Sequence, residues 1–272
     1  MPELPEVEVI VNILKKRLIG LKIKKLFVFY QPIIQELFFF KKIINKKILD
    51  VQRKGKFLLF FLSDDLVIVG HLRMEGKIYL HDNYDNLQKH KDEHFRILLE
   101  KNIILRYYDF RKFGRFALYK KDNYLKESKL EKLALDPFEI DAKNFYSKLQ
   151  KTKVSIKTCL LNQRIISGIG NIYANEILFL TRINPKIQSC FLSLQQIIKL
   201  LDNAKKILNR AIFCGGTSIS TFEAIGKKGS FQKELLVYRK DKEKCIFCSN
   251  LIQKIKISGR SSYFCIKCQP LL

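Results

Sequence analysis

The sequence predicts a multidomain α+β protein. A β-sandwich or barrel comes first, helices follow in the middle, and a small hairpin flanked by two pairs of cysteines comes last. From Leu21 to about Lys121 the apolar segments are short, rich in Phe, Ile, Leu and Val, and separated by polar turns such as 63–65. This pattern is typical of antiparallel strands and not of alternating strands and helices. Beyond Pro137 the apolar spacing becomes helical. Two Cys-x-x-Cys pairs lie near the end of the chain.

The chain opens with a predicted amphipathic helix. Pro5 suits its first turn, the acidic Glu3 and Glu6 complement the helix dipole, and Gly20 suits its end. The apolar residues that follow Pro5 at helical spacing are Val7, Ile10, Val11, Leu14 and Leu18. A helix start is therefore one interpretation that accounts for the residue types at the beginning of the chain.

A second interpretation of the same segment is catalytic. If Met1 is removed, Pro2 carries a free secondary amine. A chain-terminal amine has an ordinary pKa of about 7.7–8.0, against about 10.4 for lysine, so much of it can be neutral and nucleophilic near pH 7. Glu3, Glu6 and Glu8 crowd the same turn and are candidates for proton transfer. The segment alone leaves both interpretations open.

The predicted elements follow in order along the chain. The strand-like segments are Phe57–Leu62, Leu66–Leu72, Arg96–Leu99, Ile103–Tyr108 and Arg115–Tyr119. Residues 151–180 and 192–213 have helical apolar spacing, and Gly215 and Gly216 end the second of these helices. Residues 224–230, which contain Gly226 and Gly229 around two lysines, are predicted to form a flexible basic loop.

Composition and charge bound the class of protein. With 272 residues and 47% hydrophobic residues, the chain can bury real cores. A formal net charge of +25 indicates a polyanionic partner, most simply nucleic acid, although a lysine-rich composition alone could produce the same charge. The sequence has neither a charged leader followed by an apolar segment nor an uncharged apolar run of the roughly 18 residues that a membrane span needs. These features argue against secretion and against a membrane partner.

Cysteine usage indicates a reducing compartment and a metal site. Cys159, Cys190 and Cys214 stand alone in apolar surroundings, as reduced thiols in a cytoplasm-like compartment do. The other four cysteines form two Cys-x-x-Cys pairs, and their spacing fits one tetrahedral, structural zinc ion: Cys245, Cys248, Cys265 and Cys268. A four-thiolate site leaves no open position for catalysis. We therefore expect the zinc to hold a hairpin and to direct Arg260 at its tip.

Four further segments could carry chemistry, and each has a plain structural alternative. The glycine-flanked polar residue in 168–176 precedes a helix, where backbone N–H groups could bind phosphate or simply cap the helix. Segments 71–77 and 108–114 each place an apolar residue beside a cation, as a wedge that replaces an extruded base would, or as ordinary core. Lys56 enters an apolar strand, where it is either held near a reacting centre or merely solvated.

Together, these motifs resemble the bacterial formamidopyrimidine-DNA glycosylases over essentially the whole chain. The opening residues 1–8, the Arg-x-x-Lys-Phe-Leu segment with Lys56, the Met74 loop, residues 109–114, residues 168–173 and the four-cysteine finger all occur in the order of that family. A single one of these motifs is weak evidence for the family, whereas their combination in this order is highly specific for it.

The resemblance implies a monomeric, bifunctional DNA-repair enzyme of the bacterial cytoplasm, associated with the nucleoid through its DNA. It would remove 8-oxoguanine and formamidopyrimidines from damaged double-stranded DNA and then cleave the abasic site. Apart from one structural zinc it would need no cofactor, and no obligate protein partner is expected. Three domains are implied: a catalytic β-sandwich with a flanking helix (1–134), a helix–two-turns–helix module (135–230) and a zinc finger (231–272).

The resemblance also implies roles for individual residues. Pro2 is expected to form the Schiff base at C1′ of the sugar, Glu3 to transfer protons, and Lys56 and Arg260 to assist β- and δ-elimination. Residues expected to contact DNA are Met74, His94, Arg111, Phe113, Lys153 and Asn171. Among these, Met74, Arg111 and Phe113 would fill the space of the extruded base, with Arg111 facing the orphaned cytosine.

Departures from the family pattern concern the DNA contacts and the link between domains. The family commonly has a His-x-His pair where this chain has Asp92-Glu93-His94, so His90 or Asp92 would take the place of the first histidine. The usual Leu-Gly-Pro-Glu-Pro segment is Leu-Ala-Leu-Asp-Pro at 133–137. Arg239 stands where a glycine is common.

Two alternative functions stay open at this point. An endonuclease VIII-like relative would share the fold and the nucleophile but prefer oxidised pyrimidines; Leu4 and the Met74, Arg111 and Phe113 set argue against it. A zinc-containing DNA-binding protein without activity is the second alternative, and the presence of Pro2, Glu3 and Lys56 argues against that.

Overall fold

The structure is a computed structural model of the chain, and it describes residues 1–84, 88–218 and 228–271. Part of the predicted basic loop 224–230 lies outside the described residues. The chain divides into two compact units. The first unit contains Met1–Glu131 and Cys214–Gln232, and the second contains Lys132–Phe213 and Lys233–Leu272.

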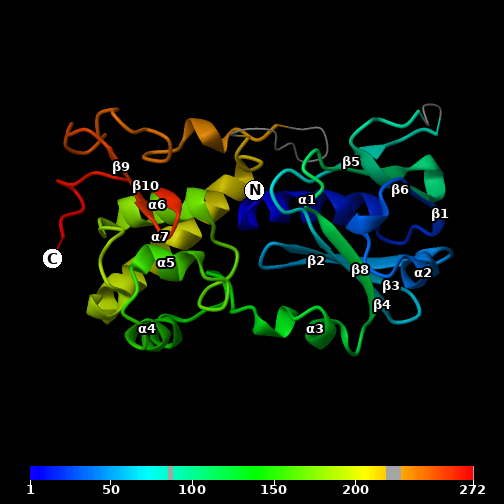
Figure 1. The fold of residues 1–272 in the computed structure, drawn as a ribbon, viewed down its shortest axis with the longest axis horizontal. Coiled ribbons are helices and arrows are strands. Elements are labelled where there is room, and N and C mark those ends of the chain that lie inside the picture. The colour runs from blue at the N-terminus through cyan, green and yellow to red at the C-terminus, as the bar shows by residue number, and fades with distance from the viewer. Residues whose placement is uncertain (85–87, 219–227, 272) are drawn as a thin grey trace. The chain divides into compact units, whose positions relative to one another are not determined.

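The first unit contains two four-stranded antiparallel sheets (Figure 1). One sheet has the order β1 (Ile23–Val28), β6 (Glu93–Leu99), β7 (Ile104–Tyr108) and β5 (Lys77–His81). The other has the order β2 (Ile48–Lys54), β3 (Phe57–Leu62), β4 (Leu66–His71) and β8 (Arg115–Lys120). The rings of Phe95 in β6 and Phe116 in β8 meet edge to face at 4.9 Å between centroids, so the sheets pack against each other. The predicted β-sandwich is confirmed.

Helix α1 (Leu4–Leu18) completes the core of this unit. Its apolar side chains at helical spacing are buried with those of both sheets, as the periodicity predicts: Val7, Ile10, Val11, Leu14 and Leu18. Gly20, whose φ is +83°, ends the helix. Among the described residues, the short helix α2 (Leu37–Phe40) and three 3-10 turns lie between strands, the turns at Gln31–Ile33, Lys41–Ile43 and Glu100–Asn102. After β8 follow the short helix α3 (Tyr124–Glu127) and a 3-10 turn at Leu130–Lys132.

The second unit contains four helices among its described residues: α4 (Ala142–Gln150), α5 (Ile156–Leu161), α6 (Asn171–Thr181) and α7 (Leu194–Phe213). The prediction of one helical segment over 151–180 is wrong, because 162–170 separates α5 from α6. In that loop the Gln163 side chain accepts from Gly168 N–H and donates to Ile169 O, each at 2.9 Å, which replaces helical backbone bonds. Within the described part of the chain, no helix is both long and apolar enough to span a membrane.

The C-terminal hairpin consists of β9 (Gln253–Ile257) and β10 (Arg260–Phe264). Ser258 and Gly259 join the strands, both with positive φ, as a two-residue hairpin turn requires. Arg260 opposes Ile257 at the end of the ladder and is exposed. The predicted hairpin with its arginine beside the turn is confirmed. Two further 3-10 turns are Ser189–Phe191 and Phe231–Lys233.

Candidate active site and zinc centre

The candidate active site begins with the residues that follow the exposed Met1 and are themselves buried. Pro2 is buried, and Glu3 and Glu6 are 3% and 1% exposed. Glu3 is the N-cap of α1, and its N–H donates to Glu6 Oε2 at 2.9 Å, the arrangement of a capping box. The two carboxylates therefore serve both interpretations of the sequence: they cap the helix, and they stand beside the chain terminus.

Glu6 also fixes a distant loop of the first unit. Its Oε1 accepts from Thr217 N–H at 2.8 Å and from Thr217 Oγ1–H at 3.0 Å. A Cβ added to Gly216 would lie 3.0 Å from Glu6 Cγ, and the φ of Gly216 is +81°. A glycine is therefore required for the backbone to approach the carboxylate this closely.

Lys56 is 6% exposed and lies in the turn between β2 and β3, after Gly55 with φ +56°. This turn is tied to α1 because Arg53 Nε donates to Glu8 Oε2 at 2.7 Å and Arg53 Nη1 donates to Gly55 O at 3.1 Å. The position of the buried ammonium is thus set by the same helix that carries the chain terminus.

Burial and nearby charges shift the pKa of the chain-terminal amine of Met1. Burial lowers the pKa of the Met1 amine from its ordinary 8.0, and the Lys56 charge lowers it further. The nearby carboxylates of Glu3, Glu6 and Glu75 act in the opposite direction and raise this pKa. An amine at this position is therefore more easily neutral than an exposed one, and proton acceptors stand close by.

His71 lies in the same region and is not among the residues that the sequence predicts. Burial lowers its pKa to about 3, with further lowering by the charges of Arg73 and Lys56, so the ring is neutral near pH 7. Its Nδ1 accepts from Arg73 N–H at 2.9 Å. In a neutral ring this leaves the proton on Nε2, which is then a hydrogen-bond donor.

The loop that carries Arg111 and Phe113 is built around Asp109, which is fully buried. The Asp109 carboxylate accepts from the N–H groups of Arg111, Phe113 and Gly114 at 3.1, 2.9 and 2.7 Å, and from Tyr107 Oη–H at 3.1 Å. Phe113 is 46% exposed, and the Arg111 guanidinium lies over its ring at 4.6 Å. One internal carboxylate therefore holds a cation and an aromatic ring outward.

Replacing Asp109 by Asn should destabilise this loop. An amide has one acceptor oxygen and would direct its NH2 group at N–H donors, so at least one buried donor loses its partner. The expected cost is about 1–3 kcal/mol of unfolding free energy, measured by urea denaturation. Asp122→Asn, at an exposed position, is the matched control. Equal midpoints for the two variants would contradict this account of the loop.

The structure places the two remaining predicted residues of the first unit, His94 and Met74, in different surroundings. His94 is 3% exposed, and its Nε2 lies 2.7 Å from Asp109 O, so the ring supports the loop from inside. A direct contact between His94 and DNA stays a prediction. Met74 is half-buried and follows Arg73, whose φ is +55°.

In the second unit, Asn171 is the predicted DNA-contacting residue that lies beside the hairpin. Asn171 is the first residue of α6, and its Nδ2 donates to Ser261 O at 3.1 Å, next to Arg260. Lys153 is exposed in the segment before α5. The structure thus brings Asn171 beside the strand of Arg260.

Lys157 is a second residue that the sequence does not predict. It is fully buried in α5, and its Nζ donates to Ser261 O and Ser262 Oγ at 2.7 Å each and to Asn175 Oδ1 at 3.2 Å. Asn175 Oδ1 also accepts from Tyr263 N–H at 2.8 Å. Three consecutive residues after Arg260 are therefore fixed to α5 and α6.

The four C-terminal cysteines form a metal-binding geometry. Their Sγ atoms all lie within 4.8 Å of one another. The Cys245–Cys268 and Cys248–Cys265 sulfur pairs are 3.8 and 3.4 Å apart, against about 3.8 Å between thiolates in a tetrahedral site with Zn–S bonds of about 2.3 Å. The donor set fits one zinc ion. Because four thiolates fill its coordination, the ion holds the hairpin and takes no part in chemistry.

Comparison with known families accounts for most of the chain. The formamidopyrimidine-DNA glycosylase N-terminal domain matches residues 1–116, and the H2TH domain of the same enzymes matches 133–223. A zinc finger found in FPG and IleRS matches 242–271. This last match agrees with the sulfur geometry in assigning one structural zinc ion to the four cysteines.

Individual relatives match over their full length. A formamidopyrimidine-DNA glycosylase of Ureaplasma parvum is 43% identical over 281 residues, which cover 99% of this chain and 100% of the relative. One of Bacillus cereus is 37% identical and covers 99% of each chain. Lactococcus lactis Fpg, solved with abasic-site DNA, is 38% identical, with a TM-score of 0.92 over 99% of this chain and 100% of that one. The chain is therefore a member of the formamidopyrimidine-DNA glycosylase family.

Proposed function

We propose that this protein excises oxidised purines, 8-oxoguanine and formamidopyrimidines, from double-stranded DNA and then cleaves the abasic site. The observation that carries the proposal is the burial of Pro2 together with Glu3, Glu6 and Lys56. Beside them burial lowers the pKa of the chain-terminal amine of Met1, and the charges of Glu3, Glu6 and Lys56 act on that amine. Family membership supports the same reaction, since the relatives are named as DNA glycosylases and Lactococcus lactis FPG has been solved with a Fapy-dG-containing DNA.

The proposed chemistry starts at the Pro2 nitrogen once Met1 has been removed. The neutral amine attacks C1′, the bond from C1′ to the base breaks, and the base leaves with that electron pair and takes up a proton. The amine loses its proton and the sugar ring opens, which gives an iminium ion, the Schiff base. Loss of a C2′ proton then expels the 3′ phosphate and a second elimination expels the 5′ phosphate; water releases the amine. Glu3 transfers the protons in these steps.

The proposed DNA contacts use both units. In the first unit, the ammonium of Lys56 neutralises a phosphate near the reacting sugar and assists β-elimination. In the second unit, Lys153 and Asn171 bind phosphates, and Arg260 both binds phosphate and assists δ-elimination. For His94, buried against Asp109 O, we propose an indirect part in DNA binding through the loop it supports. Cation–phosphate contacts of this kind weaken as salt rises.

The wedge is proposed to consist of Met74, Arg111 and Phe113. Extruding a base from the stack costs a few kcal/mol, and apolar side chains offset this cost by filling the vacated space. The exposed ring of Phe113 and the guanidinium stacked on it suit that task. The donors of Arg111 would face the orphaned cytosine.

Phe113→Ala is expected to slow excision of paired 8-oxoguanine while hardly affecting cleavage of a preformed abasic site. The reason is that an abasic site has no base left to extrude. Single-turnover rates on the two duplexes measure the difference, which should be about tenfold or more on the 8-oxoguanine substrate alone. Phe38→Ala, whose ring is 87% exposed elsewhere in the first unit, is the control. Equal slowing of both substrates would favour a structural role for Phe113.

Substrate class is tested by comparing excision from 8-oxoguanine:cytosine and thymine-glycol duplexes. The proposal requires faster excision of the purine lesion. A preference for thymine glycol would favour an endonuclease VIII-like enzyme, which the names of the relatives do not support. An inactive DNA-binding protein would bind both duplexes and excise neither base.

The proposed domain boundaries are 1–134, 135–230 and 231–272. The protein is proposed to act as a monomer in the bacterial cytoplasm, bound to DNA and without an obligate protein partner.

A further inference from the structure

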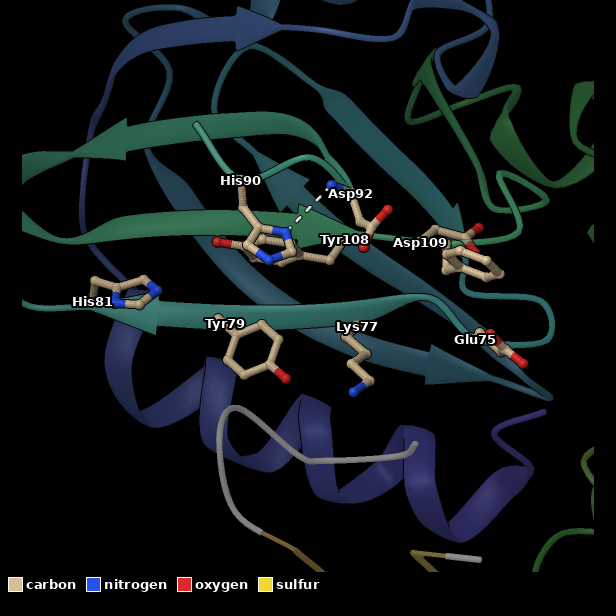
Figure 2. A pocket seen from close by; sticks show the side chains of 9 residues that line it. Glu75, Lys77, Tyr79, His81, His90, Asp92, Tyr108 and Asp109 are labelled. Atoms are coloured by element: carbon tan, nitrogen blue, oxygen red, sulfur yellow. Dashed lines mark hydrogen bonds between the residues drawn. The ribbon is translucent and has the colours of Figure 1, made fainter. Parts of the chain in front are cut away.

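A cavity of about 470 Å³ opens on the face of the first sheet that points away from the core. In β5 and β7, Ile78 and Tyr107 are fully buried in the core between the two sheets. Their neighbours Lys77, Tyr79 and Tyr108 lie on the opposite face and line the cavity. Figure 2 shows these three side chains with His90 and Asp92, which come from the loop before β6.

Aromatic rings form much of the cavity wall. The rings of Tyr79 and Tyr108 meet edge to face at 5.3 Å between centroids, and His90 and Tyr108 do so at 5.6 Å. His90 is held in place because its Nδ1 accepts from Asp92 N–H at 3.3 Å (Figure 2). A flat heterocycle could stack on one of these rings while its rim meets the edge of another.

Acidic side chains outnumber basic ones in the lining of the cavity, although the chain as a whole is strongly basic. Glu75 and Asp92 provide two accessible carboxylates against the single ammonium of Lys77. The carboxylate of Asp109, a third lining residue, is fully buried and accepts from donors of its own loop. Burial lowers the pKa of His81, which therefore stays neutral at pH 7. On a chain with a formal net charge of +25, this cavity is locally acidic. A phosphate would be repelled here, whereas a neutral ring with N–H donors would find carboxylate acceptors.

One lining residue of the cavity also acts on the candidate active site. Glu75 lines one end of the cavity, and the charge of the same carboxylate acts on the chain-terminal amine.

We propose that this cavity binds a neutral purine base, the freed 8-oxoguanine itself, after its bond to the sugar has broken. This inference rests on the proposed function, which supplies the base. The purine stacks on Tyr79 or Tyr108. Its N–H groups donate to Glu75 or Asp92, and its carbonyl oxygen accepts from Lys77. The two accessible carboxylates select the free base over a nucleotide.

Equilibrium dialysis of the DNA-free protein against free 8-oxoguanine tests the proposal. Binding should weaken about tenfold in Tyr79→Leu, because a stacking ring is lost. Tyr119→Leu is the matched control, since Tyr119 is also a half-buried strand tyrosine but lies outside this cavity. His90→Ala, at an exposed loop position, should weaken binding as well and does not endanger the fold. The monophosphate nucleotide of 8-oxoguanine should bind about tenfold more weakly than the base.

Three results would overturn the proposal: no binding of the free base, equal binding by the Tyr79 and Tyr119 variants, or nucleotide binding as tight as that of the base. Borohydride trapping of each variant on preformed abasic DNA is measured separately. Normal trapping without base binding would reject the cavity proposal alone. Failure of the unaltered protein to trap or to excise would reject the proposed function instead.

Discussion

A chain that keeps Met1, or carries an N-terminal extension, should lose base excision and borohydride trapping. Pro2 would then be an amide within the chain and could not attack C1′. Pro2, Glu3 and Glu6 are buried, so the proposed attacking nitrogen lies inside the protein, and any residue placed before Pro2 turns that nitrogen into an amide. We expect at least a thousandfold lower rate of trapping in single-turnover assays, because covalent catalysis has no substitute group at that point (~4 kcal/mol).

DNA binding provides the internal check on this result. The proposed phosphate contacts of Lys56, Asn171 and Arg260 do not need the free amine, so affinity for damaged duplex should largely survive. The same extension placed at the C-terminus is the matched control and should leave both activities in place. Full activity of the N-terminally extended chain would show that the nucleophile is elsewhere.

Removal of zinc should strongly weaken the binding of damaged DNA while leaving the first unit folded. Metal binding at such a site contributes about 10–16 kcal/mol of folding free energy, far more than a hairpin of two five-residue strands can replace. Without the metal, Ser261 and Ser262 no longer hold the ammonium of Lys157, and Arg260 loses its position. We expect Cys248→Ser to lower affinity about a hundredfold, as loss of several phosphate contacts would.

Two measurements accompany the zinc experiment. Metal content by elemental analysis shows whether Cys248→Ser has lost the ion, and circular dichroism shows whether the sheets persist. Cys190→Ser is the control, because Cys190 is a half-buried cysteine of the second unit outside the metal cluster. Normal DNA binding by zinc-free protein would contradict the role given to the finger.

Elements with one buried face were predictable from sequence. Helix α1 shows the expected helical period, and β3 coincides with the predicted strand Phe57–Leu62, with Leu58, Phe60 and Leu62 buried in the core between the sheets. The break between α5 and α6 was not predictable from apolar spacing, since Ile166 and Ile169 continue the pattern and are fully buried. Gly168, whose φ is +85°, and the side-chain amide of Gln163 make that break, and hydropathy records neither of them.

Contacts between distant residues were beyond sequence reasoning. Glu6 and Thr217 are 211 residues apart, and Lys157 is 104 residues from Ser261. A lysine inside an apolar helix was the one available signal for the second contact, because a buried ammonium needs acceptors from another element. Nothing local marks Thr217 as the partner of Glu6.

In the candidate site too, some features were predictable from the sequence and others were not. The order of the motifs predicts Pro2, Glu3 and Lys56 together, and in the structure the charges of Glu3 and Lys56 act on the chain-terminal amine. The sequence could not predict that His94 is buried against Asp109 O, since a histidine beside acidic residues has the same appearance whether exposed or buried. The acidic cavity of β5 and β7 depends on strand register, which charge counting along the chain does not give.

The account depends most on the identity of the attacking atom. Met1-free protein should be trapped with borohydride on an 8-oxoguanine:cytosine duplex, digested with nuclease and protease, and the adduct located by peptide mass spectrometry. The account predicts one sugar remnant, on the nitrogen of Pro2 in the N-terminal peptide. An adduct on Lys56 or on any other lysine, with the Pro2 amine unmodified, would contradict it.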